Sequence, residues 1–291
     1  MRLGRRLTVV AAAALVALLV PTNSALAAPA QFDEYYRHFD TGPKWQLYAH
    51  TAWVPQGLTK LNESTLIVSY YDAHELSNSI VALYDRATGN WLRTYRLDIK
   101  GHVGGIAMTS GYLWVTHGGA LRRYPRAQLS KASGSTLTTS GNFTVEASSY
   151  AYAEGEKIWV GTWDPDARSW MYSYRVSASG DLTRTTEAAI YTPSAVQGVI
   201  VSGNTIVWSQ SAGRDNDSHL IFWPKNVRYN GSTSTGNWVT APNMSEGLVV
   251  AGGQIQVIYE ACSSKYDGTM DGDEADYIVC SIHHGNFAST Y

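Results

Sequence analysis

A fivefold repeat limits what this chain can fold into more than any other feature of its sequence. Short apolar segments follow a glycine or serine at intervals of 44 to 49 residues, and a polar or small residue precedes each of these anchors. Self-similarity at this period is typical of repeat architectures, in which each repeat is one supersecondary unit. The anchors are Gly57, Gly105, Ser149, Gly198 and Gly247.

A turn-forming segment separates each anchor from a second segment in which apolar residues alternate. Alternation with a period of two predicts a strand, and two such segments around a short turn predict a hairpin. A third and usually a fourth strand follow, so each repeat predicts one propeller blade. The alternating pairs are Leu66/Val68, Leu113/Val115, Ile158/Val160, Ile206/Trp208 and Ile255/Val257.

We therefore predict an all-β fold, a five-bladed β-propeller of four-stranded antiparallel blades. The fifth repeat ends after a third strand at 277–282, and we expect the alternating N-terminal stretch 35–40 to complete that blade and close the ring. The fourth strand of the third blade is expected at 187–191. The expected blades are 50–98, 101–145, 146–192, 193–241 and 242–291 plus 35–40.

The first 27 residues have the layout of a secretory signal peptide. Arg2, Arg5 and Arg6 precede the apolar run 7–20, and Ala-Leu-Ala at 25–27 resembles a cleavage site. Removal of 1–27 leaves one predicted domain, 28–291. It also changes the net charge from −2 to −5, because the segment holds three arginines and no acid. The paired arginines leave both general secretion and twin-arginine export open.

The charge and hydropathy of the remaining chain exclude two classes of partner. A basic footprint for nucleic acid is absent, and no later segment has the 18 to 20 apolar residues of a membrane helix. We expect a secreted, extracellular monomer. Its only cysteines, Cys262 and Cys280, are expected to form one disulfide in an oxidising compartment.

This layout resembles secreted five-bladed β-propellers, an architecture shared by tachylectin-type sugar-binding lectins and by arabinanase-like and fructosidase-like glycoside hydrolases. The resemblance covers the whole chain after residue 27, as architecture. The segment nearest to the arabinanase His-Asp-Pro motif is Trp163-Asp164-Pro165, in the third repeat rather than the first. The resemblance thus implies the fold and assigns no specific family or residue role.

In a propeller the loops that enter the inner strands meet at one mouth of a central channel, the usual pocket of the fold. The residues just before the anchors, with others in the same loops, are therefore candidates for binding. The ends of the second strands add aromatic and polar side chains suited to sugar rings. The candidate ligand-binding residues are Gln56, Gln197, His50, Trp53, Tyr70, Asp72, His117, Trp163, Tyr259 and Glu260.

Three hypotheses remain open for this ring of polar residues: hydrogen bonds that only stabilise the loops, ligand binding without catalysis, and catalysis. Glycoside hydrolysis needs a pair of carboxyl groups, and a histidine beside a carboxylate suits general-base attack on a lactone or ester. The candidate catalytic residues are Glu246, Glu146 and His102.

An acidic turn near the C-terminus raises a metal hypothesis. Its ligand types suit Ca²⁺, but their spacing does not match the helix–loop–helix calcium motif, so a solvated acidic turn and an irregular calcium site both remain open. No other cofactor is expected. The candidate metal ligands are Asp267, Asp271, Asp273, Glu274 and Asp276.

Taken together, the sequence predicts an exported propeller that binds a small molecule, a glycan or cell-wall material, or a protein partner at the channel mouth. The alternative is an extracellular hydrolase acting on a glycan, a lactone or a related ester. A scaffold whose function lies on the blade rims is a third hypothesis, so whether the protein is an enzyme stays open.

Overall fold

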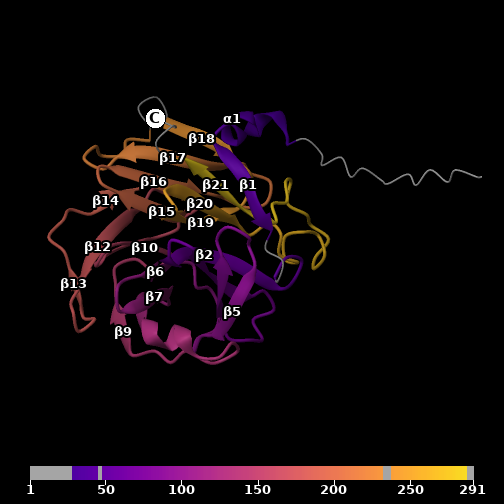
Figure 1. Cartoon of the computed structure of the whole chain (residues 1–291). Coiled ribbons are helices and arrows are strands. Elements are labelled where there is room, and N and C mark those ends of the chain that lie inside the picture. The colour runs from indigo at the N-terminus through magenta and orange to yellow at the C-terminus, as the bar shows by residue number, and fades with distance from the viewer. Residues whose placement is uncertain (1–27, 45–47, 232–236, 287–291) are drawn as a thin grey trace, which may run out of the picture.

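The computed structural model describes residues 28–44, 48–231 and 237–286. Five antiparallel sheets are arranged around a common axis, which confirms the five-bladed propeller (Figure 1). The predicted signal peptide, 1–27, lies outside the described residues. Within those residues, no helix has the length and apolar character required to cross a bilayer.

Each of the first four blades is built from consecutive strands. Blade 1 holds β2 (Trp53–Asn62), β3 (Thr65–Asp72), β4 (Ile80–Asp85) and β5 (Trp91–Arg96). Blade 2 holds β6 (Ile106–Met108), β7 (Tyr112–His117), β8 (Ala120–Pro125) and β9 (Gly141–Thr144), with the 3₁₀ helix η2 (Arg126–Ser130) between the last two. Blade 3 holds β10 (Tyr150–Glu154), β11 (Lys157–Gly161), β12 (Trp170–Val176), β13 (Leu182–Arg184) and β14 (Ile190–Tyr191). Blade 4 holds β15 (Val196–Ser202), β16 (Thr205–Gln210), β17 (Ser218–Pro224) and β18 (Asn237–Ala241).

The two ends of the chain together form blade 5. It consists of β19 (Ser245–Ala251), β20 (Gln254–Tyr259), β21 (Ser281–Asn286) and the N-terminal strand β1 (Phe39–Lys44). In Figure 1 the indigo β1 runs beside β21, with which it pairs antiparallel from Phe39 opposite Gly285. This closure by an N-terminal strand is as predicted, and it leaves no blade without its outer strand.

The closing strand begins four residues later than the sequence pattern indicates. Residues 35 and 36 belong to the short helix α1 (Asp33–Tyr36), which follows the 3₁₀ helix η1 (Ala30–Phe32). The helical turn brings the Tyr35 ring onto Phe39, with ring centroids 4.6 Å apart, and its hydroxyl accepts a hydrogen bond from Tyr259. Burial of that tyrosine against blade 5 therefore overrides the alternating pattern.

Two other expected strands also differ. The third strand of blade 5 is β21, at 281–286 rather than 277–282. The expected strand 187–191 is replaced by two short strands, β13 and β14, which both pair with β12. The chain leaves the sheet after Thr185, whose backbone N–H still donates to the Ser173 carbonyl of β12, and the Ser173 hydroxyl then donates to the Glu187 carboxylate.

The apolar core lies between the blades. Each of the five large clusters of buried side chains joins two neighbouring blades, so together they complete the ring. In β3, Leu66 and Val68 pack toward blade 5, whereas Ile67 between them packs toward blade 2. The second strands are thus buried on both faces, although alternation of apolar residues is typical of a strand with one buried face.

The anchor glycines allow neighbouring inner strands to touch backbone to backbone. A Cβ on Gly105 would collide with the backbone of Ala151 in blade 3, and one on Gly247 would collide with Leu58 in blade 1. The residue type at these anchors therefore follows from crowding near the axis.

Candidate functional site

The channel opens at one end into a cavity of about 640 Å³. In an antiparallel hairpin, the start of one strand and the end of the next lie at the same edge. For this reason the loops before the inner strands and those after the second strands meet at one mouth, and all five blades contribute to its wall. The lining residues include Gln56, His102, Gly104, His117, Ser148, Trp163, Gln197, Arg214, Met244, Glu260 and Tyr266.

A β-bulge positions three of the polar side chains at this mouth. The register of the inner strand shifts between Pro55 and Leu58, between Val196 and Gly198, and between Ser245 and Leu248. The residue before the anchor glycine, which is Gln56, Gln197 or Glu246, lies inside each shift. Bulges of this kind re-aim a side chain beside a site.

Glu246 and Glu260 form a buried pair of carboxyl groups from one blade. Glu246 comes from the bulge of β19, Glu260 follows β20, and their side chains are hydrogen-bonded to each other. Both residues are less than 10% exposed. Burial raises the pKa of both, and the hydrogen bond raises the pKa of Glu246 further while lowering that of Glu260. The pair therefore still binds a proton at pH values at which an isolated glutamate has already lost it.

The pair has one unused polar atom and one contact with the cavity. Oε1 of Glu246 has no hydrogen-bond partner within the described part of the chain. Glu260 lines the cavity, and Gln56 Nε2 donates to its Oε2 over 3.0 Å. A buried, unpartnered carboxyl oxygen is costly, and a buried acid with a raised pKa beside a cavity is a candidate for a functional site.

A chain of hydrogen bonds extends from Glu260 to the histidines. Because Gln56 donates through its amide nitrogen, its Oε1 accepts, and His102 Nδ1 lies 3.3 Å away. His117 Nδ1 donates to the carbonyl of His102 over 3.1 Å. Burial lowers the pKa of His102, whose ring stacks on Tyr71 at 4.1 Å. His102 is thus held neutral, with its Nδ1 as the donor.

Two cations sit beside the carboxyl pair, and each already has partners. Lys265 Nζ donates to the Tyr71 hydroxyl over 2.7 Å and lies 5.1 Å from the centres of the Tyr71 and Tyr266 rings. Arg214 forms ion pairs with Asp271 and Asp273. Both cations lower the pKa of Glu260, although burial outweighs them. The mouth therefore presents uncharged donors and acceptors together with one ionisable pair.

Trp163 supplies an apolar surface at the same mouth. It is 38% exposed, and its indole nitrogen donates to the Ser211 carbonyl in blade 4 over 3.4 Å. The hydrogen bond fixes the ring between blades 3 and 4 with part of its face toward solvent. An indole held in this way suits the apolar face of a sugar ring.

Five of the ten candidate ligand-binding residues line the cavity: Gln56, His117, Trp163, Gln197 and Glu260. The other five have structural partners elsewhere. Tyr70 is buried with its hydroxyl 2.9 Å from that of Tyr84, and Tyr259 donates to Tyr35. Trp53 packs against Tyr48, Asp72 accepts hydrogen bonds from the backbone of His74, Leu76 and Ser77, and His50 pairs with Asp267.

The carboxyl partner of Glu246 is not the one proposed from the sequence. Glu146 is 48% exposed in its side chain and forms an ion pair with Arg184 of β13 over 3.3 Å. The attraction to this arginine, on an outer strand of blade 3, explains why Glu146 does not line the channel-mouth cavity. Of the three candidate catalytic residues, only His102 and Glu246 belong to the hydrogen-bonded group at the mouth.

The acidic turn does not gather its carboxylates around one point. Asp271 and Asp273 both bind Arg214, whereas Asp267 binds His50, and the strand-like bridge between Asp267 and Glu274 is made by backbone. In the segments that the structure describes, no three of the five proposed ligands lie close enough together to share a cation. Three of the five acids therefore already have a cationic or imidazole partner within the protein.

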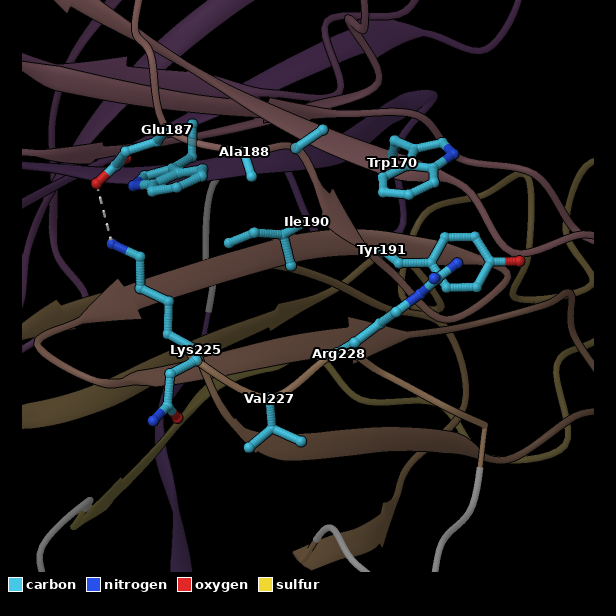
Figure 2. Close-up of a pocket in the computed structure, with 11 residues that line it drawn as sticks. Trp170, Glu187, Ala188, Ile190, Tyr191, Lys225, Val227 and Arg228 are labelled. Atoms are coloured by element: carbon cyan, nitrogen blue, oxygen red, sulfur yellow. Dashed lines mark ion pairs between the residues drawn. The ribbon is translucent and has the colours of Figure 1, made fainter.

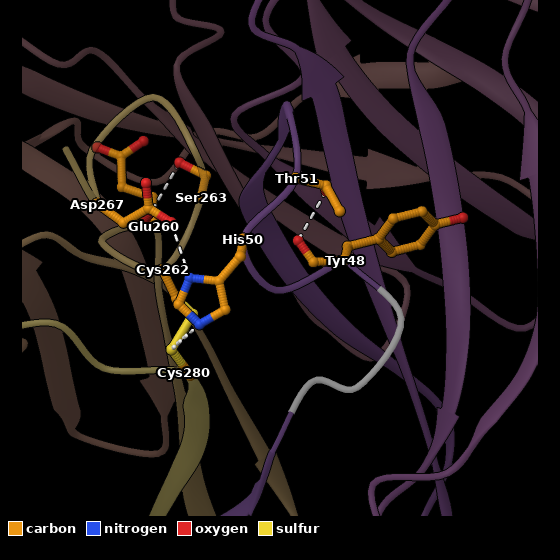
Figure 3. The surroundings of a disulfide bond; sticks show 8 residues. All are labelled: Tyr48, His50, Thr51, Glu260, Cys262, Ser263, Asp267 and Cys280. Carbon is orange, nitrogen blue, oxygen red and sulfur yellow. Dashed lines mark hydrogen bonds and ion pairs between the residues drawn. A yellow bond between two sulfur atoms is a disulfide. The ribbon is translucent and has the colours of Figure 1, made fainter. Parts of the chain in front are cut away.

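The predicted disulfide between Cys262 and Cys280 is present, with 5.0 Å between the two Cα atoms. Figure 3 shows His50 between this bond and Asp267. Nδ1 of His50 is 2.8 Å from the Asp267 carboxylate, and Nε2 is 3.7 Å from both sulfur atoms. Because both sulfurs are in the disulfide, this group offers no thiolate to a metal.

Sequence reasoning missed Arg214, Met244 and Tyr266 as residues of the mouth. Arg214 follows the second strand of its blade, β16, by four residues, and Trp163 follows the second strand of its blade, β11, by two. Extending the repeat alignment past the ends of the second strands would have found it. Met244, with a φ of 61°, lies three residues before an anchor glycine, as does Ala195, with a φ of 54°.

No protein-family model and no curated protein matches this sequence. Among solved structures, the chain is similar to Hsv2 from Kluyveromyces lactis, with 11% identity and a TM-score of 0.36 over 72% of this chain and 61% of that one. It is also similar to a hypothetical selenium-binding protein from Sulfolobus tokodaii, with 13% identity and a TM-score of 0.35 over 50% and 42% of the two chains. This chain therefore spans about three fifths of the length of the Hsv2 structure, and no residue role is carried over from either protein.

Proposed function

We propose that this protein is an exported β-propeller that binds a neutral, polyhydroxylated ligand, a sugar or a short glycan, in the channel-mouth cavity. The observation that carries the proposal is the composition of that cavity. All five blades contribute to a space of about 640 Å³, large enough for one or two sugar rings, and Trp163 offers a partly exposed indole face.

The polar groups of the cavity favour an uncharged ligand over an ion. Gln56, His102 and Gln197 are uncharged donors and acceptors, and Arg214 and Lys265 are already occupied by partners within the protein. Hydroxyl groups both donate and accept, so one sugar ring satisfies amides, imidazoles and a carboxyl pair together. Oε1 of Glu246, which has no hydrogen-bond partner within the described residues, is left to bond a water or a ligand hydroxyl.

The test is a binding measurement with a panel of neutral saccharides, among them glucose, galactose, arabinose and N-acetylglucosamine oligomers. We expect saturable binding to at least one, together with a rise in Tm. Trp163→Ala and Gln197→Ala should each weaken it about tenfold, which corresponds to about 1.4 kcal/mol. Trp91→Ala, which removes an exposed tryptophan from outer strand β5, is the matched control and should leave affinity unchanged.

The proposal is contradicted if no saccharide of the panel binds, or if the Trp163 and Trp91 variants lose saccharide affinity equally. Loss of folding is separated from loss of binding by the Tm of each unliganded variant.

Hydrolysis at the same mouth is a second candidate, favoured by the shared proton of Glu246 and Glu260. Two carboxyls in direct contact are closer than the roughly 5 to 9.5 Å that separates the acid and nucleophile or base of glycoside hydrolases. Their geometry suits instead an acid–base pair that activates water toward an ester or lactone carbonyl, as in dyads that share one proton. For this chemistry we expect Glu260→Gln to abolish release of product from chromogenic esters while Tm stays nearly constant. Turnover that persists in this variant excludes the pair as catalyst.

Export is proposed from the signal-peptide layout of 1–27 and is compatible with the disulfide in blade 5. N-terminal sequencing of protein recovered from the medium should begin at Ala28. A chain recovered only from cells with Met1 intact would contradict export.

A further inference from the structure

A second cavity of about 470 Å³ lies between the outer parts of blades 3 and 4 and shares no lining residue with the channel mouth. One wall is formed by 187–191, which connect β13 to β14 and include β14, and the other by 225–228, which follow β17. Trp159 and Trp170 complete the lining. We call this space the rim groove.

The walls of the rim groove are held in place by contacts beneath it. Trp223 Nε1 donates to the carbonyl of Val227 over 2.7 Å. Tyr229, the next residue but one, is buried edge-on against Trp208 and Trp223. On the other wall, Tyr191 pairs with Trp170 in the β12–β14 ladder. The groove is therefore preformed, which lowers the ordering cost of binding.

One end of the rim groove carries a cation without an acidic partner. The guanidinium of Arg228 lies 5.3 Å from the centre of the Tyr191 ring and 5.9 Å from that of Trp170. Across the described ranges of the chain, no carboxylate forms an ion pair with Arg228. Figure 2 shows its side chain extending along the groove toward the two rings. An arginine displayed on aromatic faces is well suited to bind an anion through its two parallel N–H groups.

The opposite end of the groove is already neutralised. Glu187, the one acid of the lining, lies 3.6 Å from Lys225 and 3.1 Å from Lys157, and the first of these pairs is dashed in Figure 2. Between the two ends, Ile190 and Val227 form an apolar strip, and Val227 is 45% exposed. The groove thus combines an excess of positive charge with exposed aromatic and aliphatic surface.

We propose that the rim groove binds an acidic polysaccharide chain, with a carboxylate or sulfate on Arg228 and a sugar ring stacked on Trp170. A sugar ring fits the amphipathic lining, because its C–H face covers Ile190 and Val227 while its hydroxyl edge stays in water. The whole chain has a net charge of −2, so general attraction of polyanions is not expected and the cation of the groove has to supply it. Because the groove lies on the blade rim, a polymer chain longer than the site can extend beyond it at both ends.

The proposal does not depend on sugar binding at the channel mouth, and the experiment keeps the two apart. Binding of the full chain to polygalacturonate is measured in the presence of a chelator, with a highly methyl-esterified form of the polymer and poly-glutamate as comparisons. We expect the esterified polymer and poly-glutamate to bind about tenfold more weakly than polygalacturonate. Because this comparison uses the unmodified protein, it tests the proposal without any variant.

Variants then locate the site. Arg228→Gln and Trp170→Ala should each weaken binding of polygalacturonate about tenfold. Arg175→Gln, which removes an exposed arginine from β12 outside the groove, and Trp163→Ala at the channel mouth should not change it. If Trp170→Ala lowers Tm, Arg228→Gln still tests whether the groove binds polygalacturonate, because it changes only a side chain at the surface.

Three results would overturn the proposal. No binding of polygalacturonate excludes an acidic polysaccharide. Equal binding of poly-glutamate assigns the groove to an acidic protein segment instead. If Arg175→Gln and Arg228→Gln weaken polygalacturonate binding equally, the overall charge of the protein, and not the groove, determines that binding.

Discussion

Blade 5 contains two groups of acidic side chains with opposite surroundings. Glu246 and Glu260 are buried together at the channel mouth, and burial raises the pKa of both. The acidic turn 267–276 is mostly exposed, and Arg214 holds the pKa of Asp271 at about 2. Partial burial raises the pKa of Asp267, but hydrogen bonds from Thr269 and His50 lower it by more. The pKa values of the two groups are thus shifted in opposite directions, because the buried pair, Glu246 and Glu260, lacks both water and a counter-ion of its own.

The comparison shows that the density of acids in a sequence is a poor guide to chemistry. The turn has five acids in ten residues, and three of them, Asp267, Asp271 and Asp273, are paired with Arg214, His50 or backbone N–H groups. The channel mouth has two acids fourteen residues apart, and these are the pair that keeps a proton and an unpartnered oxygen. Burial, rather than number, marks the candidate site.

The largest effect is expected from the bond that ties the two regions together. The disulfide spans 18 residues, includes the whole acidic turn, and begins two residues after Glu260. Replacing both cysteines by alanine should lower the free energy of unfolding by about 3 kcal/mol, as measured by denaturant titration. A loss close to zero would show that the contacts of Arg214 hold the turn without the bond.

The second prediction concerns the pH dependence of stability. Because the folded pKa values of Glu246 and Glu260 are raised, the folded state binds more protons than the unfolded state above the ordinary glutamate pKa of 4.5. The contribution of this pair to the free energy of unfolding is therefore fully present below that pH. It is lost as the pH rises toward the folded pKa values, by up to about 1.4 kcal/mol per pH unit for one proton.

Glu246→Gln keeps an N–H donor toward Glu260 and removes the shared proton, so it should flatten this slope. Glu274→Gln, the same change at an exposed position of the turn, is the control and should leave the slope as it is. Parallel pH profiles for all three proteins would contradict a shared proton.

The smallest effect is expected at the turn itself. Asp271→Asn removes an exposed ion pair with Arg214, and such pairs contribute little in water. We expect a change in Tm much smaller than that caused by loss of the disulfide, and no saturable rise in Tm on addition of Ca²⁺ to the unmodified protein. A calcium-dependent rise that Asp271→Asn abolishes would restore the metal hypothesis for this turn.

The fold was predictable because each repeat contains an alternating apolar segment and an anchor glycine or serine. The convergence of Gln56, Gln197 and Glu260 at one mouth followed from the same repeat. The first residue of β1 could not be predicted in this way, because the helical turn that buries Tyr35 depends on contact with Tyr259, more than 200 residues away.

The partner of Glu246 depended on details that alternation does not encode. A one-residue bulge in β19 places Glu246 beside the end of β20, and the same shift occurs in blades 1 and 4. Glu146 precedes its anchor by three residues, but its side chain pairs with Arg184, which no local pattern indicates. The rim groove was not predicted from the sequence, because Arg228, Tyr191 and Trp170 come from different strands and loops that no local pattern links.

The most direct test of the account is a pH titration of the glutamate side-chain carboxyl carbons by NMR, with Glu246→Gln and Glu260→Gln used to assign the two signals. The account predicts that Glu246 remains protonated at neutral pH, when the aspartates of the turn have long been ionised, and that its signal responds to the ionisation of Glu260. If both signals complete their change near pH 4.5, the two carboxyls do not share a proton, and the proposed site loses the feature that distinguishes it from an ordinary channel mouth.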